Sequence, residues 1–235
     1  MVKAIYFGLF VMLSFGIIAQ ETENGKHNKL DQHGRKQGYW KVFDQSGALK
    51  YEGSFINDHP VDTFTYYYPD GKVKAISLML EQGRRSKTQF FHLNGRLMGE
   101  GNFLEQQKDS TWRYYSDLDG TLLSVEFYRN GKLDSNVINY YPEGEVVEKI
   151  PYRNGIKEGK WTQYFPDGKL KLKATYKNDL LEGMMFVYYQ NGVVQISGNY
   201  KHNFKDGLWI HFNERGEIIK KETYKNGQLK ELEDF

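Results

Sequence analysis

The chain has 235 residues, and its 32 basic and 30 acidic side chains give a formal net charge of +2. A charge this close to neutral argues against nucleic acid as a partner. Aromatic residues make up 16% of the chain, and the sequence holds 24 Gly, 5 Pro and no Cys. This composition excludes a disordered or collagen-like chain, a disulfide framework and Cys-based zinc sites, and it favours a β protein with many turns.

The first residues have the pattern of a secretory signal peptide. Lys3 precedes an apolar run from Ala4 to Ala19, and polar residues begin at Gln20. The run is marginal for a membrane span, which needs about 20 apolar residues. We therefore predict a signal peptide over residues 1–19, a flexible linker over 20–29 and no integral membrane span after cleavage. An uncleaved anchor is the alternative, and both place the remaining chain in the periplasm, the outer cell envelope or the medium.

A repeat of 24 residues organises the rest of the chain. Turn glycines recur at separations of 24, 24, 25, 24, 24, 24 and 24 residues, namely Gly47, Gly71, Gly95, Gly120, Gly144, Gly168, Gly192 and Gly216. The residue two positions after each glycine is apolar, and the residue eight positions after it is large and mostly aromatic. Eight units of one supersecondary type are therefore expected.

Each unit has the pattern of a β-hairpin. In one unit the first strand begins at Trp161, Pro166-Asp167-Gly168 supplies the turn, and Leu170 to Tyr176 alternates at period two. Aromatic residues three apart in the first strand, such as Trp161 and Tyr164, do not fit strict alternation, so we expect a bulge or aromatic contacts on both faces. The predicted fold is all-β, an elongated single-layer antiparallel sheet of about eight 24-residue hairpins over residues 30–235, with an N-terminal half-repeat as a cap.

The unit from Gly159-Lys160-Trp161 to Pro166-Asp167-Gly168 resembles a MORN repeat, specifically the bacterial variant found in proteins often catalogued as antitoxins. The segment from Asp31 to Trp40 resembles the start of such arrays, and the resemblance covers about residues 30–230. It implies a single-sheet β array that serves as a binding or assembly module, without catalytic residues. Eukaryotic members are linked with membrane-lipid contact, but the sequence reveals no basic patch for such contact.

One column of the repeat is a candidate binding stripe. The residue after the second aromatic position of strand one varies between units, and we expect it to be exposed. Four of its members are aromatic: Tyr68, Tyr141, Phe165 and Tyr189. Tyr141, Phe165 and Tyr189, in three successive units, would form a row of rings about 10 Å apart, with Tyr68 as an outlier. Such a row would suit contact with a sugar, a peptide or a protein. The alternative is that these rings only pack on one another across the sheet.

No pattern of catalytic or metal-binding residues stands out from the repeat. The six histidines lack the spacing of metal ligands, and turn formation explains the recurring turn carboxylates. We therefore expect no enzyme activity, no cofactor and no metal. The predicted function is an exported scaffold or binding module of the bacterial cell envelope that binds a protein partner or self-associates, with glycan as a further ligand class. The alternative is an immunity or antitoxin protein that neutralises a toxin partner.

Overall fold

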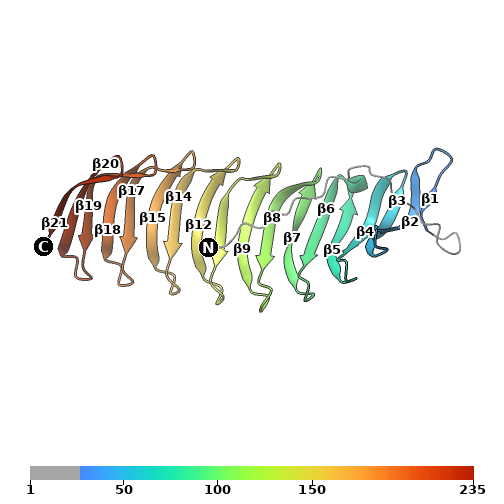
Figure 1. Cartoon of the computed structure of the whole chain (residues 1–235), viewed down its shortest axis with the longest axis horizontal. Helices are drawn as coiled ribbons and strands as arrows, with labels where there is room; N and C mark the ends of the chain where they lie inside the picture. The colour runs from blue at the N-terminus through green and yellow to red at the C-terminus, as the bar shows by residue number, and fades with distance from the viewer. Residues whose placement is uncertain (1–26) are drawn as a thin grey trace. The chain divides into compact units, whose positions relative to one another are not determined.

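The computed structural model describes residues 27–235, and strands joined by turns form nearly all of this range (Figure 1). The predicted signal peptide lies outside the described residues, as does the predicted linker up to residue 26. Within the part of the chain that the structure describes, no helix is long and apolar enough to cross a membrane.

The chain divides into two compact units. The first holds the described residues up to Arg96 together with Asn102–Gln107, and the second holds Leu97–Gly101 and Lys108–Phe235. Strands up to β6 are β1 (Lys29–Leu30), β2 (Lys36–Phe43), β3 (Leu49–Ile56), β4 (His59–Tyr67), β5 (Val73–Leu80) and β6 (Arg85–Phe91), and a short 3₁₀ turn, η1 (Glu81–Gly83), precedes β6. Two strands, β7 (Leu97–Leu104) and β8 (Gln107–Tyr115), contribute residues to both units.

The second unit continues with the same alternation of long strands, some preceded by a two-residue strand. These are β9 (Leu122–Arg129), β10 (Lys132–Leu133), β11 (Asn136–Tyr140), β12 (Val146–Arg153), β13 (Ile156–Lys157), β14 (Gly159–Tyr164), β15 (Leu170–Lys177), β16 (Leu180–Leu181), β17 (Gly183–Tyr188), β18 (Val194–Lys201), β19 (Phe204–Phe212), β20 (Ile218–Lys225) and β21 (Gln228–Asp234). They lie side by side in chain order in a single layer (Figure 1). The predicted all-β fold of antiparallel hairpin repeats is confirmed.

The bulge that was one of the two expectations for these hairpins is present. In β14–β15, Gln163 pairs with Leu172 but Tyr164 pairs with Leu170, so β15 carries one extra residue. The same shift occurs just before the turn in the hairpins of β2–β3, β4–β5, β8–β9, β11–β12, β17–β18 and β19–β20. Trp161 and Tyr164 face opposite sides of the sheet because they lie three residues apart on β14, and the bulge changes which residue of β15 pairs with Tyr164.

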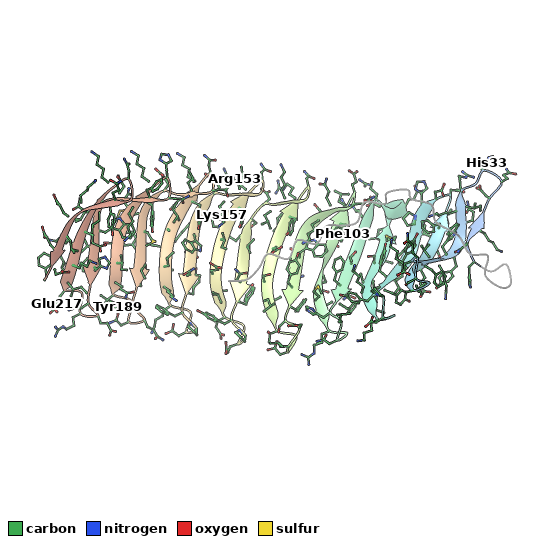
Figure 2. All side chains as sticks on the ribbon, viewed as in Figure 1. His33, Phe103, Arg153, Lys157, Tyr189 and Glu217 are labelled. Atoms are coloured by element: carbon green, nitrogen blue, oxygen red, sulfur yellow. The ribbon has the colours of Figure 1, made fainter. Side chains whose placement is uncertain are left out.

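The strands end at two rims. The Gly rim is formed by the turns that hold the eight glycines of the 24-residue spacing, and the Asn rim by the turns that join one hairpin to the next. In Figure 2, Tyr189 and Glu217 lie at the Gly rim of the second unit, whereas Arg153 and Lys157 lie at its Asn rim. Asn-rim turns have positive φ at both central residues, for example 52° at Asn154 and 83° at Gly155. Asn and Gly tolerate this left-handed conformation, so Asn-Gly favours these turns.

The core is a ladder of large rings laid over small residues on one face of the sheet, called here the core face. A Cβ atom on Gly198 would lie 2.1 Å from the Trp209 ring, and one on Gly101 would lie 2.3 Å from the Trp112 ring. Trp112 and Trp209 are 0% and 1% exposed. A single layer can bury these two rings because each lies against a glycine of a neighbouring strand, where no side chain intervenes.

A lysine stands four residues before each tryptophan in the described chain, and its ammonium lies over the aromatic ladder. The pairs are Lys36 with Trp40, Lys108 with Trp112, Lys157 with Trp161 and Lys205 with Trp209. The Nζ-to-centroid distances are 5.0 Å at Trp40, 4.9 Å at Trp112 and 4.4 Å at Trp209. Lys157 instead lies 5.0 Å from the Tyr176 ring, which contacts Trp161. Units without tryptophan hold other residues there, so the lysine belongs with the indole, which it covers with its stem and attracts through its charge.

Candidate binding surface

The four residues of the predicted stripe open the turns of the Gly rim. The backbone N–H of Tyr68 donates to the Lys72 carbonyl at 2.8 Å, and Gly71 closes the turn by donating to the Tyr68 carbonyl at 2.9 Å. Tyr141, Phe165 and Tyr189 make the same pair of backbone bonds in their own turns. The stripe residues therefore follow the ends of the strands, where a turn fixes their direction.

The hydroxyls of the three stripe tyrosines bond to the next repeat. Tyr68 donates to the Phe91 carbonyl at 2.8 Å, Tyr141 to the Tyr164 carbonyl at 2.9 Å, and Tyr189 to the Phe212 carbonyl at 2.8 Å. In each case the acceptor lies 23 residues further along the chain. We call these bonds the tyrosine staples.

The staples change the interpretation of the stripe. Tyr68, Tyr141, Phe165 and Tyr189 are half-buried, so the expectation that this column is exposed was wrong. Burial, with the nearby charge of Asp70, raises the pKa of Tyr68. The tyrosine hydroxyls thus link neighbouring repeats through backbone carbonyls. A role of the stripe in binding stays a prediction, as does the alternative that the rings pack on one another.

A second set of ties joins repeats at the Asn rim. The backbone N–H of Asp179 donates to the Lys157 carbonyl at 3.0 Å, and the Asp179 carboxylate accepts from the Lys157 N–H at 2.8 Å. Asp58 makes the same two bonds with Lys36. Both rims are therefore fastened by hydrogen bonds between consecutive repeats.

The face opposite the core face, called here the outer face, carries a cluster of lysines in the second unit. Lys149 pairs with Thr162, Thr162 with Lys173, and Lys173 with Phe186, so these four side chains share a face across β12, β14, β15 and β17. Lys160 lies two residues before Thr162 on β14 and therefore points to the same face. The three lysines Lys149, Lys160 and Lys173 form the lysine strip.

Two shallow hollows lie on the lysine strip and meet at Lys160. One, of about 190 Å³, is lined by Lys160, Lys173, Ala174, Thr175 and Met184. The other, of about 370 Å³, is lined by Asn136, Lys149, Pro151, Lys160, Thr162 and Tyr164. Lysine residues and apolar residues therefore line the same depressions.

The lysine strip is not evident in the sequence, because its members lie 11 to 24 residues apart and come together only through the strand register. A repeat alignment holds a signal for it. The fifth residue after each turn glycine is Glu52, Ile76, Glu100, Val125, Lys149, Lys173, Ser197 and Lys221. The column thus changes from acidic to basic along the chain.

The buried carboxylate Glu222 has its hydrogen-bonding capacity taken up by its neighbours. It accepts from Lys220, from His211 at 3.1 Å and from the Tyr224 hydroxyl at 3.2 Å, and Lys205 lies 3.6 Å away. Burial raises the pKa of Glu222, but these hydrogen bonds and charges outweigh it and lower the pKa to about 2. Among residues 27–235, no group of three or more His, Asp or Glu side chains could hold a metal ion.

The chain was compared with curated proteins and with solved structures. No curated protein matches the chain. A solved structure described as TcdB2-TccC3-TEV is 13% identical, with 80% of this chain and 12% of that chain covered and a TM-score of 0.23. The Tc holotoxin pore of Photorhabdus luminescens is likewise 13% identical over 80% of this chain and 12% of that chain, with a TM-score of 0.22. The chain therefore spans only a small part of the length of either structure.

The profile of the MORN repeat variant matches residues 36–57, 63–79, 133–154, 157–178, 181–202 and 205–226. Each of these segments contains strands of one hairpin and the Gly-rim turn between them, and together the segments make up more than half of the chain. This chain belongs to the MORN repeat variant family.

Proposed function

We propose that this protein is an exported, non-enzymatic scaffold of the bacterial cell envelope that binds a protein partner through the outer face of its sheet. The family consists of non-catalytic repeat modules that generally mediate protein interactions. Export rests on the signal-like pattern of residues 1–19 in the sequence.

The observation that carries the proposal is the exposure of large apolar side chains on strands of the outer face. Leu208 precedes the buried Trp209 on β19, so it points away from the core, and it is 49% exposed. Met184 is 49% exposed, and Leu78 in the first unit is 42% exposed. Apolar side chains exposed on one face and surrounded by polar residues are typical of interaction surfaces.

The test places a photo-cross-linking amino acid at Leu208 in one variant and at Glu217 on the Gly rim in another. After irradiation of intact cells, we expect protein adducts from position 208 and few from position 217. Adducts that form only at the rim, or at neither position, would contradict binding through the outer face. Capture of a toxin at position 208 would instead favour the immunity alternative.

Export has its own test. The mass of the chain recovered from the cell envelope should correspond to a protein that begins at Gln20. A protein that stays in the cytoplasm with Met1 intact would contradict the export part of the proposal and leave the binding part to the cross-linking result.

A further inference from the structure

We propose that the lysine strip, Lys149, Lys160 and Lys173, binds an acidic, extended segment of a partner polypeptide. This proposal rests on the proposed function, because it names the chemistry of the protein that the outer face would bind.

The lysines of the strip form no ion pair within the described part of the chain. None of the three lysines has a carboxylate oxygen within 4.0 Å among residues 27–235. Carboxylates of the neighbouring strands have other partners: Glu148 accepts from Asn139, Trp161 and Gln163 on the core face, and Glu158 accepts from the Asn178 N–H. Three cations without acidic neighbours raise the local concentration of an anionic partner.

The equivalent position in the first unit is neutralised, which makes the strip a local feature. There Glu52 pairs with Lys41 at 3.4 Å and accepts from the Tyr67 hydroxyl at 2.6 Å. Glu52 and Lys149 occupy the same column of the repeat. The same column of the repeat thus carries a paired charge at Glu52 and an unpaired charge at Lys149.

The composition of the strip and its surroundings favours a polypeptide ligand over a phosphate polymer. The strip holds no arginine, the side chain whose planar fork suits phosphate best. The hollows around it are lined by Pro151 and Met184 as well as lysine, and Lys173 lies 4.4 Å from the Phe186 ring centroid. A segment with both carboxylates and apolar side chains fits this mixture, whereas a polyphosphate would leave the apolar atoms without contacts.

The distance between the lysines matches the repeat of an extended peptide. Lys149 and Lys173 lie on strands separated by one strand, so their attachment points are about 10 Å apart at the usual strand separation of about 4.8 Å. Three residues of a polyproline II segment span about 9.3 Å. A segment that crosses the strands with an acidic residue at every third position would therefore meet both lysines, with Lys160 beside it.

The experiment measures binding of a labelled peptide with the repeating sequence Glu-Pro-Leu, about twelve residues long, to the mature chain by fluorescence anisotropy. The test variant is K149Q/K160Q/K173Q. The control is K177Q/K201Q/K225Q, which removes the same charge from exposed strand ends. We expect the peptide to bind the wild type, to bind the test variant about tenfold more weakly, and to bind the control within about twofold of the wild type.

Two further probes make the result decisive. A Gln-Pro-Leu peptide should bind at least about tenfold more weakly than the Glu peptide. Inorganic polyphosphate that binds more tightly than the peptide and depends on the same lysines would overturn the polypeptide assignment. Equal loss of binding in the test and control variants, or no loss in either, would also overturn it. If the triple variant fails to fold, as judged by circular dichroism, K160Q alone should weaken binding about twofold to threefold.

The strip and the proposed function can fail separately. Photo-cross-linking from position 208 is repeated in the K149Q/K160Q/K173Q background. Adducts that persist there, together with an inert strip in the peptide assay, would reject the acidic partner while the scaffold function stands.

Discussion

At the scale of single residues, the tyrosine hydroxyl has opposite consequences at two positions. The Tyr141 hydroxyl donates to the Tyr164 carbonyl, whereas the Tyr51 hydroxyl is buried and has no hydrogen-bond partner in residues 27–235. A satisfied hydroxyl stabilises the fold, and an unsatisfied buried one costs the free energy of its lost hydration. The same substitution should therefore change stability in opposite directions at the two sites.

We predict that Tyr141→Phe lowers the free energy of unfolding by about 1 kcal/mol, because it removes one tyrosine staple and keeps the ring. Tyr51→Phe serves as the matched control and should leave stability unchanged or raise it. Urea denaturation followed by circular dichroism measures both. A loss at Tyr51 as large as that at Tyr141 would mean that the staple has no particular role.

The small residues of the core ladder lead to a second prediction. Gly198→Ala places a methyl group 2.1 to 2.6 Å from the rigid Trp209 ring, so the ring must move, and we expect a loss of about 1 to 3 kcal/mol. Ala174 occupies the same column of the ladder and pairs with Trp161. Ala174→Gly should lower the free energy of unfolding by about 1 kcal/mol or less and leave the Trp161 indole in place. Tryptophan fluorescence and urea denaturation report the two effects. Unchanged emission and stability in the Gly198 variant would show that the ladder is not tightly packed.

At the scale of the hairpin, β19–β20 depends on the ionised carboxylate of Glu222. Its pKa lies near 2 in the folded chain against an ordinary value of 4.5. The folded state thus binds fewer protons than the unfolded state between these values. The stabilisation is complete above the ordinary pKa and is lost as the pH falls toward 2.

We therefore predict that the wild type loses on the order of 2 to 3 kcal/mol of stability through this group as the pH falls from about 6 to about 2. Glu222→Gln should be less stable near neutral pH and should show a shallower acid dependence. Glu231→Gln, on the exposed strand β21, should keep the wild-type dependence. Urea midpoints at several pH values give the comparison, and parallel acid curves for wild type and Glu222→Gln would contradict the assignment.

The hairpin is also the scale at which sequence patterns predicted most. The turn glycines and the column of large residues sufficed for the strands and the turns. The three-residue spacing of Trp161 and Tyr164 left open a bulge or aromatic residues on both faces. Such features depend on residues close together in the chain. The lysine strip and the tyrosine staples were not predicted, because they join residues 11 to 24 positions apart and require the register across strands, which the extra bulge residue alters.

At the scale of the whole molecule, the strand pairings within each unit join each long strand only to the strands next to it in the chain. Ties at both rims likewise connect consecutive repeats. Stability in such an array is approximately a sum of repeat terms and nearest-neighbour terms, so a repeat can be removed without destroying the others. What must be kept is the alternation of strand directions.

The last prediction follows from this modularity. Deletion of residues 157–180 removes one 24-residue repeat and joins Ile156 to Leu181, which keeps the order of turn and strand intact. We expect the shortened chain to fold, with the strand content of a β protein and a free energy of unfolding lower by about 1 to 4 kcal/mol. Circular dichroism and urea denaturation measure both properties.

Deletion of residues 157–168 is the matched control, since it removes only the first strand and its turn. It joins Ile156 to Lys169, so β12 would be followed by a strand that runs parallel to it in the native sheet and cannot pair with it through a short connection. We expect this variant to lose cooperative unfolding or to aggregate. A half-repeat deletion as stable as the full-repeat deletion would mean that the register between neighbours does not hold the array together, and the nearest-neighbour account of its stability would have to be abandoned.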